Sequence, residues 1–211
     1  DDQALIISEL LSSVVEDDFH ALADRMYQGE DSGYGNSRAN YINHITAIIN
    51  LSRANGIATK ELPQFAQDSL SSFWAVIGDN EVDGQELNQQ ALHALEAVIN
   101  EFDKFTDLNK TNQGFSNEVK KMYNDVLEGS FTWHDWQAMR KKEDISGKYV
   151  PKALTTELAH LAAQVCQHSD FHKDYNNYIT RCFKYAQLTL DAYEVFKRDR
   201  GLLDFTDQEA V

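Results

Sequence analysis

The chain has 211 residues, of which 42% are hydrophobic and 25% charged, a composition that excludes a disordered polypeptide and allows a sizeable core. Its formal net charge of −15 at pH 7 makes a surface that on average repels phosphate backbones. No apolar run approaches the roughly 18 residues that span a bilayer, so we expect no membrane partner. Two cysteines cannot build a disulfide framework, and a cytoplasmic location is the simpler expectation.

The acidic residues are unevenly distributed along the chain. Residues 1–100 contain 16 acidic and four basic residues, whereas residues 101–211 contain 18 acidic and 15 basic residues. Residues 140–152 contain five bases and two acids, so this segment is locally basic. We therefore expect the acidic half to face away from any nucleic acid and the later segment to make any contact.

The first half of the chain is predicted to be helical. Only two prolines occur, and apolar residues recur at three- and four-residue steps, which predicts one long helix from Ala4 to Met26. A second helix begins near Tyr41 and ends at Asn55-Gly56, since glycine commonly follows the last residue of a helix. Thr59 can cap a third helix.

The helical pattern continues to the C-terminal end. Ser116 is expected to begin a short helix that Gly129 ends, and Thr132 with Asp135 predicts a capping box for the next one. No alternating strand pattern occurs, so we predict an all-α fold of about seven or eight helices in a bundle-like arrangement without a significant sheet. We expect a single domain over residues 1–200 and a junction segment at 201–211. The predicted helices cover residues 4–26, 41–55, 59–77, 85–102, 116–129, 132–140, 154–165 and 175–196.

No catalytic residue is predicted in this chain. A phosphate-binding GxxxxGK[ST] loop is absent, because Gly147-Lys148 is followed by Tyr149 and lacks the earlier glycine. Residues 79–84 resemble the start of a calcium loop, but Gln90 stands where a bidentate Glu is required, so a solvated turn is favoured over a metal site. We therefore expect neither a metal nor a cofactor in this chain.

Aromatic and basic side chains are interleaved after Thr132. Cations can bind phosphates and an aromatic ring can stack on a base, so this pattern predicts a DNA contact. For the two tryptophans, a role as buried core residues is the favoured alternative. The cations can equally be favourable positive charges at the negative, C-terminal end of the helix dipole. The candidate DNA-contacting residues of this segment are Trp133, Trp136, Arg140, Lys141, Lys142, Lys148 and Lys152.

The C-terminal passage from Tyr193 to Glu209 resembles the "Y-x-x-x-K-x-x-x-G-L-L-D-F-x-D" passage of UvrD/Rep- and RecB-like superfamily 1 DNA helicases. In that family the passage marks the end of the helical insert called subdomain 1B and the return to a motor domain. Residues 52–57 and 132–136 are also similar to the RecB-like branch. The junction motif corresponds to Gly201, Leu203, Asp204, Phe205 and Asp207.

The resemblance implies that the chain is a non-catalytic part of an ATP-dependent DNA helicase or helicase–nuclease, which unwinds DNA in repair or recombination. It implies ATP and Mg²⁺ in the parent protein, motor domains of the same polypeptide as partners, and DNA as the substrate. The absence of an initiator Met before Asp1 agrees with a piece of a larger protein. Lys197, Arg198 and Arg200 become further candidate DNA contacts.

Two other classes of function remain open. The acidic first half can act as a protein-interaction module that binds a basic partner through residues such as Glu16, Asp17 and Asp18. Alternatively, the chain can be a metal-binding helical bundle, because Glu157 and His160 form an ExxH step and two further histidines follow four residues apart. That hypothesis uses Glu157, His160, His168 and His172.

Overall fold

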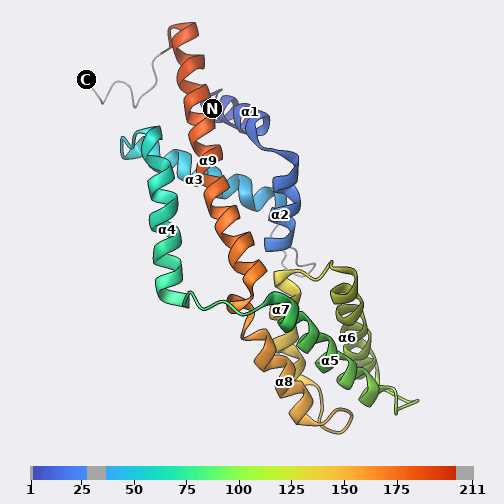
Figure 1. Cartoon of the computed structure of the whole chain (residues 1–211). Helices are drawn as coiled ribbons and strands as arrows, with labels where there is room; N and C mark the ends of the chain where they lie inside the picture. Colours follow the sequence, from blue (N-terminus) through green and yellow to red (C-terminus); the bar gives the residue numbers. More distant parts are fainter. Residues whose placement is uncertain (1, 28–36, 203–211) are drawn as a thin grey trace. The chain divides into compact units, whose positions relative to one another are not determined.

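The computed structural model describes residues 2–27 and 37–202, and in this part of the chain it confirms the all-α class (Figure 1). Nine α-helices and three short 3-10 helices account for the regular structure of the described residues, in which an isolated bridge between Val82 and His168 is the only β pairing. Among these residues, no helix has both the length and the apolar character to cross a membrane. The elements are α1 (Asp2–Val14), α2 (Asp17–Tyr27), α3 (Ser37–Ala54), η1 (Thr59–Glu61), α4 (Leu62–Ile77), α5 (Gly84–Phe102), α6 (Lys110–Glu128), α7 (Trp133–Arg140), η2 (Lys141–Asp144), α8 (Lys152–Ala162), η3 (Val165–Gln167) and α9 (Ser169–Arg200).

The prediction of one long helix from Ala4 to Met26 is wrong, because the chain breaks between α1 and α2. The backbone N–H of Val15 still bonds to Leu11 O at 3.3 Å, whereas the N–H of Phe19 bonds to Glu16 O at 3.0 Å in a new turn. Asp17 and Asp18 lie in the first turn of α2, where negative charge is favourable at the positive end of the helix dipole. The acidic run therefore favours starting a second helix over continuing the first.

The predicted helix ends at Gly56 and Gly129 are confirmed, and Gly201 ends α9 in the same conformation. Gly129 and Gly201 have φ of +70° and +61°, a left-handed conformation that glycine adopts without a steric penalty. At the end of α9, Leu202 N–H donates to Lys197 O at 2.9 Å and Gly201 N–H donates to Arg198 O at 3.2 Å. These two bonds satisfy carbonyl groups that the helix leaves without an intrahelical partner.

The predicted N-caps are partly correct. Thr132 accepts a hydrogen bond from Asp135 N at 3.2 Å and the Asp135 carboxylate accepts one from Thr132 N at 2.9 Å, which confirms the capping box. Thr59 instead lies in a 3-10 turn that precedes α4, and α6 begins at Lys110 with Asn109 as its cap, well before Ser116. Ser116 lies inside α6 and is buried.

The chain divides into two compact units. Unit 1 consists of Asp1–Asp24, Ser32–Val76 and Asp174–Val211, and unit 2 consists of Arg25–Asp31 and Ile77–Lys173. The boundaries fall inside α2, α4 and α9, so these helices contribute residues to both units. The single domain over residues 1–200 stays a prediction.

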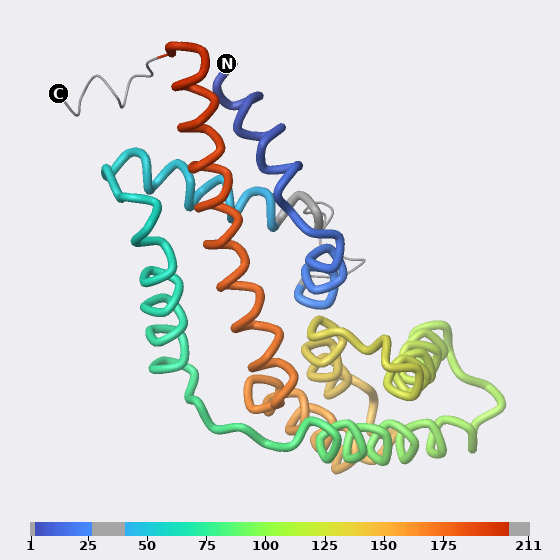
Figure 2. Tube along the Cα trace, turned by 45° about the horizontal axis from the view of Figure 1, so that its top comes forward, coloured from blue at the N-terminus to red at the C-terminus, as the bar shows by residue number. Residues whose placement is uncertain are grey.

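The core of unit 1 forms where α2, α3 and α4 meet α9. Phe19 of α2 is fully buried and stacks on Tyr178 of α9, with ring centroids 5.4 Å apart. Phe73 of α4 stacks on Tyr175 with centroids 4.0 Å apart. Figures 1 and 2 show α4 running alongside α9 while α3 crosses it. The aromatic residues of α9 thus form the central contact surface of this unit.

The core of unit 2 is a helical cluster in which α5 contacts α6 and α8, and α7 contacts α8. Every turn of α5 buries an apolar residue, including Leu87, Leu95 and Phe102, as its apolar stripe predicts. α7 adds Trp136 and Met139, which are 1% and 0% exposed. This packing fixes the position of the chain that follows α7, which is the locally basic segment.

Candidate functional site

The two tryptophans of the basic segment lie in the core of unit 2. Trp133 is 8% exposed and Trp136 is 1% exposed. Both rings meet the buried His168 ring edge to face, with centroid distances of 5.0 and 5.5 Å. Their placement favours the core-anchor role, because neither ring presents a free face on which a base could stack.

Lys142 is also buried, with 3% of the residue exposed. Its ammonium group forms an ion pair with Glu118 of α6 and lies 5.5 Å from the centre of the Phe115 ring. The Glu118 side chain is 58% exposed, so the pair lies at the edge of the core. Lys142 is thus held by α6, whereas its neighbour Lys141 is exposed.

We expect the two members of this ion pair to respond differently to substitution. Glu118→Ala should lower the free energy of unfolding by about 1–3 kcal/mol, because it leaves the buried ammonium of Lys142 without its carboxylate. Lys142→Met should be close to neutral, because methionine fills similar space without a charge. Urea denaturation curves measure both variants, and equal losses would contradict this account.

Four of the predicted cations are exposed, and we call Arg140, Lys141, Lys148 and Lys152 the basic edge. They lie on the end of α7, on η2, on the following loop and on the start of α8, and these elements pack on one another. Lys152 donates to the carbonyl oxygen of Glu143 at 2.6 Å. Within residues 2–27 and 37–202, no carboxylate pairs with Arg140, Lys141 or Lys148. The basic edge therefore carries positive charge that can bind an anion.

Two aromatic residues outside the predicted set accompany the basic edge. Lys148 Nζ lies 5.2 Å from the centre of the Tyr149 ring. The Tyr149 ring meets Phe105 at a centroid distance of 5.2 Å and an interplanar angle of 74°. Tyr149 follows Lys148 directly in the sequence, so its association with the basic edge could have been predicted. Phe105 follows α5 and is brought close to Tyr149 only by the fold.

The cations at the end of α9 have mixed surroundings. Lys197 is 5% exposed, pairs with Glu194 at 2.8 Å and lies over the Tyr193 ring. Arg198 and Arg200 are exposed, and the Arg200 guanidinium lies 3.8 Å from the centre of the Phe196 ring. Gly201 follows the last residue of α9 with a φ of +61°. The other junction residues, Leu203, Asp204, Phe205 and Asp207, lie outside the described residues.

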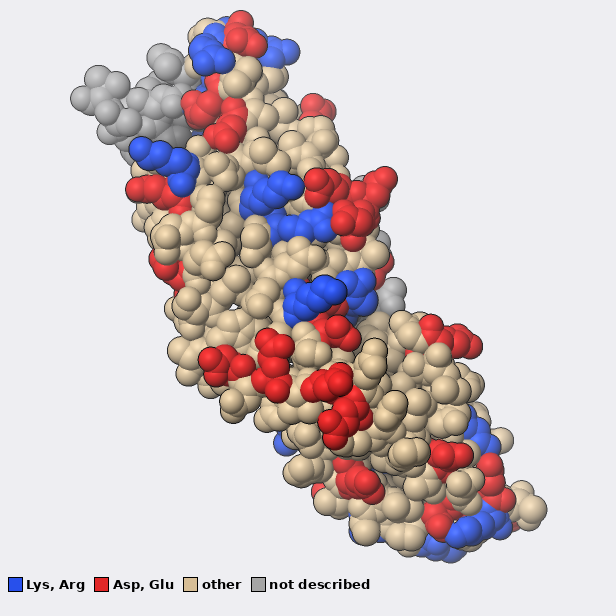
Figure 3. All heavy atoms as spheres, in the orientation of Figure 1, with Lys and Arg blue, Asp and Glu red and all other residues tan. Residues whose placement is uncertain are grey.

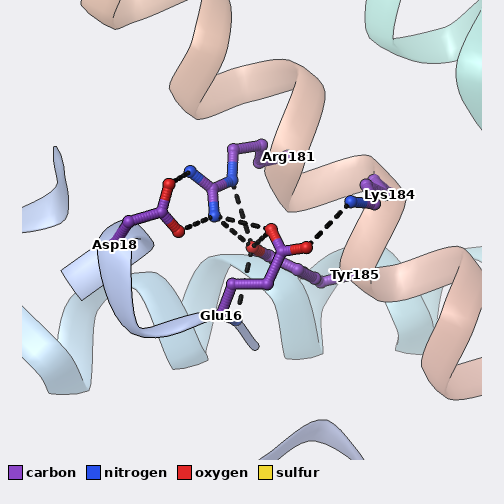
Figure 4. A network of polar contacts seen from close by, with 5 residues as sticks. All are labelled: Glu16, Asp18, Arg181, Lys184 and Tyr185. Atoms are coloured by element: carbon purple, nitrogen blue, oxygen red, sulfur yellow. Dashed lines mark hydrogen bonds and ion pairs between the residues drawn. The ribbon is translucent and has the colours of Figure 1, made fainter. Parts of the chain in front are cut away.

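A polar network joins α9 to the turn between α1 and α2 (Figure 4). The Arg181 guanidinium bonds to both carboxylate oxygens of Asp18 at 2.6 and 2.9 Å and to Glu16 at 2.8 Å. Tyr185 donates its hydroxyl hydrogen to Glu16 at 2.9 Å, and Lys184 lies 3.4 Å from the same carboxylate. Two cations of α9 are thus neutralised inside unit 1 and do not add to a DNA-binding surface.

These contacts shift the protonation equilibria of the network. The hydrogen bond from Tyr185, followed by that from Lys184, holds the pKa of Glu16 below its ordinary value. The hydrogen bond from Arg181 lowers the pKa of Asp18. Burial raises the pKa of Tyr185, so its hydroxyl stays protonated and able to donate. The network is therefore complete at neutral pH.

The candidate metal ligands have other partners. His172 Nε2 donates to the carbonyl oxygen of Cys166 at 2.7 Å, and His168 Nδ1 accepts from the backbone N–H of Asp170 at 3.2 Å. Glu157 and His160 lie on the exposed side of α8. In the part of the chain that the structure describes, no three His, Cys, Asp or Glu side chains come close enough to hold a metal.

The loop before α5 and the two thiols also have structural roles. The bridge between Val82 and His168 is made by Val82 N–H donating to Gln167 O at 2.7 Å and Ser169 N–H donating to Val82 O at 3.1 Å. Burial raises the pKa of Cys182 to about 12, and it raises that of Cys166 as well. At neutral pH both thiols are protonated, which is unsuited to nucleophilic catalysis.

No protein-family model matches this chain, and no match is found among curated proteins or solved structures. The fold and the site define an all-α protein with an exposed basic edge on an otherwise acidic chain. Its function is therefore inferred from the residues and their placement.

Proposed function

We propose that this chain is a non-catalytic helical subdomain of an ATP-dependent DNA helicase or helicase–nuclease that acts on DNA in the cytoplasm. The observation that carries the proposal is the passage that begins at Tyr193 in the last turns of α9 and continues past the helix end at Gly201. The passage resembles the helicase junction between a helical insert and a motor domain. ATP and Mg²⁺ would bind in the motor domains of the parent protein.

The basic edge is the part of the chain best suited to contact DNA. Its cations are exposed and can bind phosphates, while the tryptophans and Lys142 of the same segment are buried. On the face of the molecule drawn in Figure 3, basic side chains lie in small groups among acidic ones. We therefore expect a small, weak and salt-sensitive contact, independent of DNA sequence.

Charge reversal at the basic edge tests this proposal. The variant Arg140→Glu, Lys141→Glu, Lys148→Glu should lose most of its affinity for a short blunt DNA duplex, measured by fluorescence anisotropy between about 50 and 200 mM salt. The slope of log K against log salt should become shallower by about 0.9 for each phosphate that the variant no longer neutralises. Lys142 is left unchanged, because its reversal would place a second carboxylate beside Glu118 and disturb the fold.

A matched control carries the same change in net charge elsewhere. Lys60, Lys110 and Lys173 are exposed lysines outside the basic edge, and their replacement by Glu should weaken binding less than the reversal at the edge. If both variants lose the same amount of affinity for the duplex, the binding depends on net charge alone and not on the basic edge. Absence of duplex binding by the wild-type chain at low salt would remove the DNA role.

The two other classes of function receive less support from the geometry. An acidic interaction module needs free carboxylates, yet Glu16 and Asp18 pair with Arg181 of the same chain. A metal-binding bundle needs converging ligands, and the described residues contain no such cluster. The DNA-binding subdomain therefore remains the function that the exposed side chains favour.

A further inference from the structure

Phe105 is a large aromatic side chain on the surface beside the basic edge. It is 38% exposed, although its ring contacts Tyr149 at a centroid distance of 5.2 Å. Lys148 Nζ lies 5.2 Å from the centre of the Tyr149 ring, so a cation and two rings adjoin one another. Phe105 lies in the loop after α5 and Tyr149 in the loop before α8, so the contact between their rings brings these two loops together.

The two carboxylates that come shortly before Phe105 in the sequence are neutralised, whereas Asp107, two residues after it, is exposed. Lys104 pairs with Glu101 at 2.6 Å, and Lys120 of α6 pairs with Asp103 at 2.6 Å. These pairs reduce the repulsion that an anionic ligand would meet near the ring. The exposed Phe105 ring and the exposed Lys148 ammonium are therefore accessible to the same ligand.

We propose that Phe105, Tyr149 and Lys148 form a binding site for unpaired DNA, in which one base stacks on the exposed Phe105 ring. Lys148 and its neighbours on the basic edge bind the phosphates of the same strand. This inference rests on the proposed DNA-binding function and specifies the ligand of the same edge as single-stranded DNA.

The geometry favours an unpaired strand over a duplex. Stacking on a side chain needs an exposed base face, which a single strand offers and a continuous duplex hides between neighbouring base pairs. Cations alone would bind the phosphates of either form. Trp133 and Trp136 are buried, whereas the Phe105 ring on the surface beside these cations is 38% exposed.

Replacing Phe105 tests the stacking step. Phe105→Ala should weaken binding of a fluorescent oligothymidine strand roughly 5- to 150-fold, the range for loss of one stacked base, while affinity for a blunt duplex changes less than about twofold. Phe105→Leu, which keeps apolar bulk without an aromatic face, should show the same selective loss. Phe105→Tyr should retain binding, because its ring can still stack.

Phe65 supplies the matched control. It is a phenylalanine of α4 with a similar exposed fraction, 40%, and among the described residues no cation lies over its ring. Phe65→Ala should change neither affinity. Urea midpoints of the Phe105 and Phe65 variants show whether each is folded under the binding conditions, and Phe105→Leu serves where Phe105→Ala is unstable.

The outcomes separate this inference from the proposed function. Unchanged single-strand affinity in Phe105→Ala and Phe105→Leu, or an equal loss for duplex and single strand, would overturn the stacking site. If the stacking site is overturned but charge reversal at the basic edge abolishes duplex binding, the proposed DNA-binding function is retained without the stacking site. If the wild-type chain binds neither duplex nor single-stranded DNA, both the stacking site and the proposed DNA-binding function are contradicted.

Discussion

Replacing Trp136 by alanine is expected to lower the free energy of unfolding by about 3–5 kcal/mol. The Trp136 side chain is among the largest that are fully buried, and it belongs to the hydrophobic cluster of unit 2 with Leu95 and Met139. Removing the indole leaves a cavity that the surrounding helices can fill only in part. Equilibrium urea unfolding, followed by far-ultraviolet circular dichroism, measures the loss.

The same variant separates a core role from a DNA-binding role. Under conditions where Trp136→Ala is folded, its affinity for DNA should equal that of the wild type, because the ring lies inside the core. Trp136→Phe should recover part of the lost stability by refilling the space. A fully stable Trp136→Ala protein with weakened DNA binding would show instead that the indole contacts DNA.

Replacing Arg181 by methionine is expected to lower the thermal midpoint of unfolding clearly at neutral pH. Arg181 connects α9 to Asp18 and Glu16, and its side chain is only 11% exposed. Each kcal/mol of lost stability lowers the midpoint by about 2–4 °C in a chain of this size. Lys104→Met is the control, because Lys104 and Glu101 form a surface pair whose loss should change the midpoint little.

The effect of Arg181 should depend on pH. The network lowers the pKa values of Glu16 and Asp18 below the ordinary values of 4.5 and 3.8, so it stabilises the folded chain when both carboxylates are ionised. That contribution is complete above pH 4.5 and is lost as the pH falls through the lower folded-state values. The midpoint difference between wild type and Arg181→Met should therefore shrink in acid. A difference that stays constant from neutral pH into acid would contradict this linkage.

Helix ends can be predicted from single residues, whereas one break between helices cannot. Gly129 and Gly201 mark ends because a left-handed conformation favours glycine, and the capping box at Thr132 is a local pattern. The break at Glu16 is hidden in the sequence because the apolar spacing continues from Leu11 to Phe19. Its cause combines acidic residues at a helix start with a distant partner, Arg181 of α9.

The candidate site is predictable in composition but not in exposure. Lys141 and Lys142 are neighbours of the same kind, and only the position of Glu118 on α6 decides that Lys142 is held in the core. Periodicity does place the tryptophans on a core-facing side, which favours the anchor role. Phe105 gives no local signal, since its proximity to Tyr149 arises from the packing of unit 2.

The order of segments in the two units has a consequence for synthesis of the chain. Phe19 meets Tyr41 of α3, which is made soon after it, but its other ring partners, Tyr178 and Tyr185, lie on the last helix and are made much later. Ile77–Lys173 is one continuous stretch that can fold as it emerges, because nearly all of unit 2 is then complete. The core around Phe19 is completed only when α9 is made, so the N-terminal helices are the segment that we expect chaperones to bind during translation.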